Sequence, residues 1–193
     1  LQERIDSVKR FALPDENGNW LIYLQEKPKV KKKEVLQLVV LNPLNKKQFT
    51  FAKADTFAIA SKGSRVALLA ATDSTKLRSL IVLHPEQSRI DTLLTDSVQI
   101  RNMAFDVVGR QLAWLASRDT ASAKNFSLFL SDLKKPIRTI ADTLSPALSK
   151  GWAPSVNAVP YFSEDGTKLF FGTAKMVKRA EKDTLTDDDK AKL

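Results

Sequence analysis

A short pattern recurs four times along the chain: an apolar residue, a polar turn that contains glycine, and a run of apolar residues. The four copies are FALPDENGNWLIYL (11–24), FAIASKGSRVALLA (57–70), MAFDVVGRQLAWLA (103–116) and YFSEDGTKLFFGT (161–173). Their aligned glycines, Gly18, Gly63, Gly109 and Gly166, are spaced by 45, 46 and 57 residues. Such a period limits the fold to architectures that place similar units side by side.

A second pair of strand-like segments follows the pattern in each of the first three units. These segments are rich in β-branched, apolar and aromatic residues and are bounded by Pro, Asn or Asp, as the strands of hairpins are. They are 34–41 with 47–51, 78–83 with 88–94, and 126–132 with 137–142. No window keeps a 3.6-residue apolar period, which excludes a helical chain. Four strands in a repeat of about 45 residues indicate the blade of a β-propeller.

We therefore predict an all-β fold, a β-propeller fragment of about three and a half four-stranded antiparallel blades that occupies residues 1–193. The blades are expected at about 5–51, 54–95 and 97–143, with an incomplete one at 156–193. Complete propellers have four to eight blades, so the chain corresponds to half a propeller or less.

The residues of the repeat have predictable places in such a blade. Each turn glycine is expected to adopt the positive φ that a tight connection needs. Five aromatic side chains are predicted to be buried where neighbouring blades pack: Trp20, Tyr23, Trp114, Phe170 and Phe171. The third glycine spacing is 11 residues longer than the second, and we expect the extra length to be a loop at 145–157 that exposes Trp152 as its contact residue.

The chain is basic, with 31 Lys and Arg against 22 Asp and Glu. Five lysines lie within 27–33, which we interpret as a solvated loop between two strands. A nucleic-acid partner is the weakest hypothesis, because no aromatic residue lies within the lysine run for base stacking. No membrane insertion is expected either, since the longest uncharged stretch, 151–163, has 13 residues and a spanning helix needs about 20.

Catalytic and metal-binding residues are hard to find in this sequence. There is no cysteine, and the only histidine, His84, excludes a site built on several histidines. We expect His84 in a surface turn at the end of a strand, without a catalytic role. A serine hydrolase needs a Gly-x-Ser-x-Gly elbow beside its histidine and carboxylate, and the chain has no such elbow. We assign no catalytic residue and no cofactor, and the binding residues stay open.

Two acidic segments resemble metal loops only in part. Asp15, Asn17, Asn19 and Glu26 fall at positions 1, 3, 5 and 12 of a calcium loop, but position 6, where the bend needs glycine, is Trp20. A turn rich in Asn and Asp explains these residues better. The run 187–189 has three aspartates without a second oxygen cluster close by, which favours a solvated loop or the start of a short helix. We expect no metal at either place.

The segment FSEDGTKLFF and its weaker copies resemble the repeat of Tol-type and prolyl-oligopeptidase propellers, whose consensus is a Ser-Pro-Asp-Gly turn before an apolar strand. Residues 148–174 and 182–193 are similar to the propeller of secreted prolyl-oligopeptidase-type serine peptidases of Bacteroidetes-like bacteria. Two departures stand out. The chain lacks the elbow of their hydrolase domain, and it has no adjacent pair of glutamates, with which the dipeptidyl-peptidase branch holds the substrate amine.

The resemblance implies WD40-like repeats that form the non-catalytic propeller portion of a serine peptidase, gating or positioning peptide substrates. Its expected partner is then the hydrolase domain of the parent chain, and its expected location is the periplasm or the cell exterior. The alternative is a non-enzymatic propeller that scaffolds protein partners. A Gly-x-Ser-x-Gly motif after a strand farther along the gene would favour the first of these.

The expected incompleteness of the propeller suggests self-association. The chain starts at Leu1 without a methionine, so we interpret it as cut from something longer or freed of an export signal. Terminal blades would lack a neighbour, so apolar side chains around Leu21, Tyr23, Leu169 and Phe171 are expected to face water. The backbone along 168–173 is expected to lack pairing partners. A homodimer through these propeller edges would cover both defects.

Overall fold

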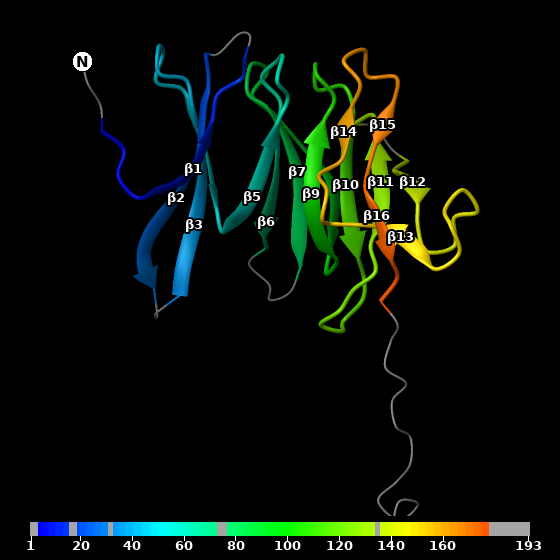
Figure 1. Cartoon of the computed structure of the whole chain (residues 1–193). Coiled ribbons are helices and arrows are strands. Elements are labelled where there is room, and N and C mark those ends of the chain that lie inside the picture. Colours follow the sequence, from blue (N-terminus) through cyan, green and yellow to red (C-terminus); the bar gives the residue numbers. More distant parts are fainter. Residues whose placement is uncertain (1–3, 16–18, 31–32, 73–76, 134–135, 178–193) are drawn as a thin grey trace, which may run out of the picture.

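The fold is built from antiparallel strands. The computed structural model describes residues 4–15, 19–30, 33–72, 77–133 and 136–177, and helices are absent from these ranges. Three four-stranded sheets follow one another along the chain, with the orders β1-β2-β3-β4, β5-β6-β7-β8 and β12-β11-β10-β9. They stand side by side in chain order (Figure 1). The predicted all-β partial propeller is confirmed.

The strands of the three sheets coincide closely with the apolar runs of the repeat. The first sheet consists of β1 (Val8–Ala12), β2 (Leu21–Val30), β3 (Lys33–Leu41) and β4 (Gln48–Ala52). The second consists of β5 (Ala54–Ile59), β6 (Val66–Ala71), β7 (Arg78–His84) and β8 (Arg89–Asp96). The third consists of β9 (Gln99–Phe105), β10 (Leu112–Ser117), β11 (Ser127–Ser131) and β12 (Arg138–Ala141).

The fourth unit differs from what the sequence indicates. Besides the expected hairpin of β14 (Tyr161–Phe162) and β15 (Leu169–Phe170), it contains β13 (Trp152–Pro154), which pairs with β16 (Thr173–Lys175). The insertion expected to be a loop therefore contributes a strand, and Trp152 is half-buried rather than exposed. The strands β15 and β16 also pair the backbone that was expected to lack partners, and the Gly172 carbonyl accepts a hydrogen bond from the Ser155 amide at 2.9 Å.

The core lies in the seams between sheets, where both faces of a strand are covered. Trp20, Ile22 and Leu38 of the first unit pack with Phe57 and Leu68 of the second. The seam between the second and third sheets contains Leu80, Val82, Leu112 and Trp114, among others. A third cluster joins the third sheet to the fourth unit, where half-buried Leu169 and Phe171 pack against it. Continuous apolar runs are what strands covered on both faces require.

The glycine turns of successive units are joined to one another by hydrogen bonds. The Asp15 amide donates to the Ser61 carbonyl at 2.8 Å, and the Lys62 amide donates to the Val107 carbonyl at 2.7 Å. The Gln111 Nε2 donates to the Gly166 carbonyl at 2.9 Å. Gly109 has φ +74°, and a Cβ there would lie 2.9 Å from the Ala60 Cβ. The predicted positive φ is confirmed at Gly63, Gly109 and Gly166, while Gly18 lies outside the described residues.

The aromatic predictions divide into two groups. Trp20, Tyr23 and Trp114 are buried, as expected. Phe170 is 43% exposed, so its predicted burial is wrong; its ring stacks on that of Tyr161, with the centroids 4.9 Å apart. Phe171 is half-buried against the third sheet, so its predicted burial is met only in part. The separate expectation that side chains of the terminal blades face water is wrong for Tyr23, because Ile5 and Val8 pack against its cluster. Leu21, Leu169 and Phe171 are likewise half-buried against core clusters rather than fully exposed.

Candidate functional site

His84 is the last residue of β7 and belongs to the seam between the second and third sheets. Side chains alternate between the two faces of a strand, so His84 lies on the same face as Leu80 and Val82, which pack in that seam. It is 3% exposed. The expectation of a surface turn is therefore wrong: the turn begins at Pro85, after the imidazole has been placed inside.

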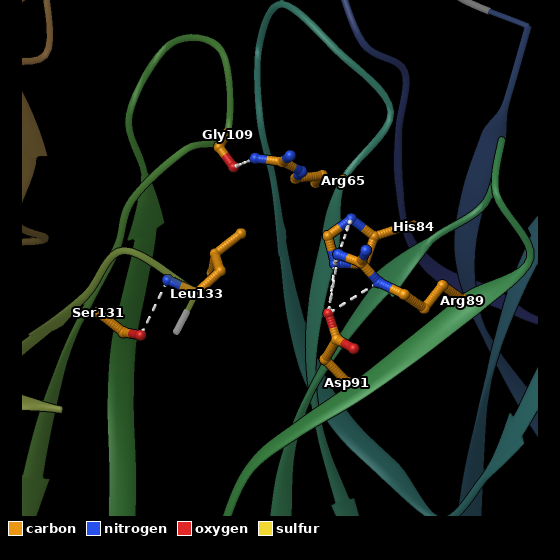
Figure 2. A network of polar contacts seen from close by, with 7 residues as sticks. All are labelled: Arg65, His84, Arg89, Asp91, Gly109, Ser131 and Leu133. Carbon is orange, nitrogen blue, oxygen red and sulfur yellow. Dashed lines mark hydrogen bonds and ion pairs between the residues drawn. The ribbon is translucent and has the colours of Figure 1, made fainter. Parts of the chain in front are cut away.

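A carboxylate and a guanidinium hold the imidazole. In the register of β7 and β8, Arg89 lies opposite His84 and Asp91 lies opposite Val82, which puts all three polar side chains on one face. The His84 Nε2 is 2.9 Å from the Asp91 Oδ2, and the Arg89 Nε donates to the same oxygen at 3.1 Å. Figure 2 shows these side chains converging in the space between the strands.

The arginine also lies against the ring itself. The Arg89 Nη2 is 3.1 Å from Nε2 and 3.5 Å from Nδ1 of His84. One atom that approaches both ring nitrogens lies over the ring face rather than in its plane. The in-plane Nε2–H is then directed at Asp91, so the fold selects this tautomer.

Burial is the main influence on the charge of His84. Burial lowers the pKa of the imidazole below its ordinary 6.5, and the positive charges of Arg89 and Arg65 lower the pKa further. The Asp91 carboxylate acts in the opposite direction and does not outweigh them. The imidazole is therefore neutral near pH 7.

These groups line one side of a cavity of about 940 Å³ between the second and third sheets. The other side comes from the third unit, where Arg110 and Gln111 precede β10 and Asp132 and Leu133 follow β11. We call this cavity the arginine pocket and define it by its ionisable residues, which are Arg65, His84, Arg89, Asp91, Arg110 and Asp132.

Two hydrogen bonds fix the walls of the arginine pocket. Arg65, just before β6, donates to the Gly109 carbonyl and so ties the second unit to the turn of the third. The Leu133 amide donates to the Ser131 Oγ at 3.0 Å, which shapes the chain as it leaves β11. Both contacts are visible in Figure 2, where Leu133 faces the Arg65–His84 side across the pocket.

The geometry does not suit nucleophilic catalysis. A catalytic histidine has one ring nitrogen on a carboxylate and the other on the nucleophile. In the described part of the chain, no serine or threonine hydroxyl makes a hydrogen bond to His84, whose ring nitrogens face Asp91 and Arg89. What the arginine pocket offers is a set of guanidinium donors, which suits an anion.

A second cavity, of about 810 Å³, occupies the opposite end of the same seam. Its floor is apolar and contains Trp114 and Phe129, whose rings stack with centroids 5.9 Å apart. On its rim, Arg118 and Asp96 form an ion pair at 2.6 Å. The arginine of this rim is therefore paired with a carboxylate, whereas Arg65 in the arginine pocket donates to a carbonyl.

In the segment with calcium-loop spacing, the position where a calcium loop bends is occupied by Trp20. Trp20 is buried and its Nε1 donates to the Glu86 Oε1 at 2.6 Å, immediately before β2 begins. Asn17 and the run 187–189 lie outside the described residues. Within the described ranges, no three His, Asp or Glu side chains come together as a metal site would require.

The lysine run does not form the expected loop. It extends β2 and β3, and Val30 pairs with Lys33 near the tip of this long hairpin. Residues 31–32 lie outside the described residues. In the described chain, no helix has the length and apolar character that crossing a lipid bilayer demands.

The sequence does not match any known protein-family model or any curated protein. Among solved structures, the chain is similar to oligogalacturonate lyase of Vibrio parahaemolyticus, with a TM-score of 0.53, 10% identity and coverage of 90% of this chain and 49% of the lyase. It is also similar to an acylaminoacyl peptidase of Pyrococcus horikoshii, with a TM-score of 0.49, 13% identity and coverage of 67% and 25%.

A third similar structure is the β-propeller domain of the Trilobed protease from Pyrococcus furiosus, with a TM-score of 0.43, 12% identity and coverage of 79% of this chain and 61% of that domain. The chain spans about a quarter of the length of the acylaminoacyl peptidases it matches. The chain is similar to β-propeller structures, as the repeat predicts, and at these identities the likeness concerns the fold.

Proposed function

We propose that residues 1–193 form a partial β-propeller that serves as the non-catalytic portion of a prolyl-oligopeptidase-like serine peptidase. Its role is to gate or position peptide substrates for a hydrolase domain. The observation that carries the proposal is the FSEDGTKLFF repeat and the turn it forms. Asp165 accepts hydrogen bonds from the Ser163 hydroxyl at 2.6 Å and from the Thr167 amide at 3.0 Å, and Gly166 completes the turn with φ +72°.

The described polar groups support a non-catalytic role. His84 is buried, neutral near pH 7 and held by Asp91 and Arg89, so it is not available as a general base for a serine. The nucleophile, base and oxyanion donors then belong to the partner hydrolase domain. We place this protein in the periplasm or outside a bacterial cell, on the same resemblance.

The test uses the full gene product beside the chain itself. The chain alone is expected to turn over neither a peptide anilide nor an ester, whereas the full product is expected to hydrolyse both. Gating further predicts that the full product cleaves short peptides but not folded proteins, and that removal of residues 1–193 widens this size limit. A retained rate on a dipeptide ester shows that the shortened enzyme is folded. An unchanged size limit, or a gene without a Gly-x-Ser-x-Gly elbow, contradicts the proposal.

A non-enzymatic scaffold for protein partners is the second candidate. Exposed aromatic residues favour it, since Tyr161 and Phe170 stack on each other while 61% and 43% exposed. Aromatic side chains are enriched where proteins bind each other. The sequence of the full gene distinguishes the two functions. A Gly-x-Ser-x-Gly elbow farther along the chain favours the peptidase, and its absence favours the scaffold.

A further inference from the structure

Two arginines of the arginine pocket carry charges that no described carboxylate balances. Arg89 is paired with Asp91 at 3.1 Å. Arg65 donates to the neutral carbonyl of Gly109, and Arg110 makes neither an ion pair nor a hydrogen bond with any described residue. A guanidinium is always charged near pH 7 and gains most from a planar anion that accepts two parallel hydrogen bonds.

The charges of the pocket add up to a small excess of positive charge. Arg89 is paired with Asp91, the imidazole is neutral near pH 7, and neither Arg65 nor Arg110 forms an ion pair with a described carboxylate. Within the described residues, Asp91 is thus engaged by Arg89 and His84, and the positive charge left towards the cavity belongs to Arg65 and Arg110. A cavity of about 940 Å³ is large enough for a small organic anion.

We propose that the arginine pocket binds a carboxylate-bearing ligand, with Arg65 and Arg110 as its guanidinium ligands. A carboxylate offers the planar pair of acceptor oxygens that a guanidinium binds through two parallel hydrogen bonds, whereas a phosphate dianion would bring a second negative charge beside Asp91. Asp91 and Arg89 hold the imidazole in the lining of the same pocket. The proposal concerns a binding site and holds whether or not the chain belongs to a peptidase.

The chain provides its own reporter for this test. His84 is the only histidine, so its ring C–H signals are unique in the NMR spectrum of the whole chain. The ring lies within the arginine pocket, and an anion bound there changes the field around it. The probe is N-acetyl-triglycine, which has one carboxylate and no amine; its C-terminal amide is the uncharged control, and inorganic phosphate is the competing anion.

Arg110→Gln is the decisive variant, because Arg110 is exposed and holds no other described residue in place. It is expected to weaken binding of N-acetyl-triglycine about tenfold or more. Arg118→Gln is the matched control: it removes an exposed positive charge from the other end of the same seam and should leave binding unchanged.

The expected result is saturable shifts of the His84 signals with N-acetyl-triglycine, whose dissociation constant rises about tenfold or more in Arg110→Gln and is unchanged in Arg118→Gln. Shifts that do not saturate, that keep the same dissociation constant in Arg110→Gln, or that appear equally with the amide overturn the proposal. Tighter binding of inorganic phosphate than of the carboxylate overturns the assignment of ligand class. A native spectrum of Arg110→Gln confirms that any loss is not due to unfolding.

Discussion

At the scale of single residues, His84 is a titratable group whose neutral form the fold requires. Burial, Arg89 and Arg65 lower the pKa of His84 below 6.5 in the folded chain, against the weaker opposing effect of Asp91. As the pH falls through 6.5, the unfolded chain binds a proton that the folded chain does not. Stability due to His84 is thus fully present above pH 6.5 and is lost as the pH falls towards the folded-state pKa.

Urea unfolding should show this loss as the pH falls below 6.5, at about 1.4 kcal/mol for each pH unit in which only the unfolded chain is protonated. His84→Gln keeps an N–H donor for Asp91 but does not titrate. The variant is expected to lose less stability over the same range. Equal losses in both proteins would assign the pH dependence to other groups.

Gly109 tests a second residue-scale constraint, the close approach of neighbouring turns. Gly109→Ala must adopt φ +74° and place its Cβ 2.9 Å from the Ala60 Cβ, so we expect a loss of about 2–4 kcal/mol in the free energy of unfolding. Gly151→Ala is the control, with φ +80° and no heavy atom within 4 Å of the added Cβ. It should cost only about 1–2 kcal/mol. If urea unfolding gives similar losses for the two variants, the positive φ alone explains the cost and the contact with Ala60 contributes nothing.

At the scale of elements, alternation along strands explains what could be predicted from sequence. The glycine turns and paired apolar runs indicate the three full sheets, because each strand pairs with its neighbour in the chain. The pairing of β13 with β16 could not be seen, since it joins segments separated by the whole β14–β15 hairpin. The place of His84 was readable in principle from its alternation with Leu80 and Val82. The arginine pocket could not be predicted from the sequence, because its two walls come from different units of the repeat.

The seam between the second and third sheets should dominate the stability of these elements. Trp114 is 1% exposed and stacks on Phe129, so Trp114→Ala removes a buried ring from the seam and is expected to cost about 3–5 kcal/mol. Trp152→Ala, on the short half-buried strand β13, is the comparison and should cost clearly less. Urea unfolding of both variants measures the difference. A larger loss for Trp152→Ala would show that the fourth unit, rather than the seam, limits stability.

At the scale of the whole molecule, exposed aromatic residues and net charge act in opposite directions. Tyr161 and Phe170 lie opposite each other in register and expose stacked rings on the β14–β15 hairpin. In the first sheet, by contrast, Ile5 and Val8 cover Tyr23, so this side chain offers no apolar surface for association with a second copy. The fourth unit is therefore where a second copy of the chain would find an apolar face, while the net charge of +9 repels it.

We accordingly predict weak two-fold self-association through the β14–β15 face that strengthens as salt rises, because salt screens the repulsion and leaves apolar burial intact. Each large side chain buried on association contributes about 1.5–3 kcal/mol, against a substantial loss of translational and rotational freedom. Phe170→Ser should abolish dimers, whereas Phe11→Ser, 66% exposed on the first sheet, should not. Light scattering at low and high salt measures the effect. A monomer at high protein concentration and high salt, or loss of dimers in Phe11→Ser alone, would rule out this face as the contact.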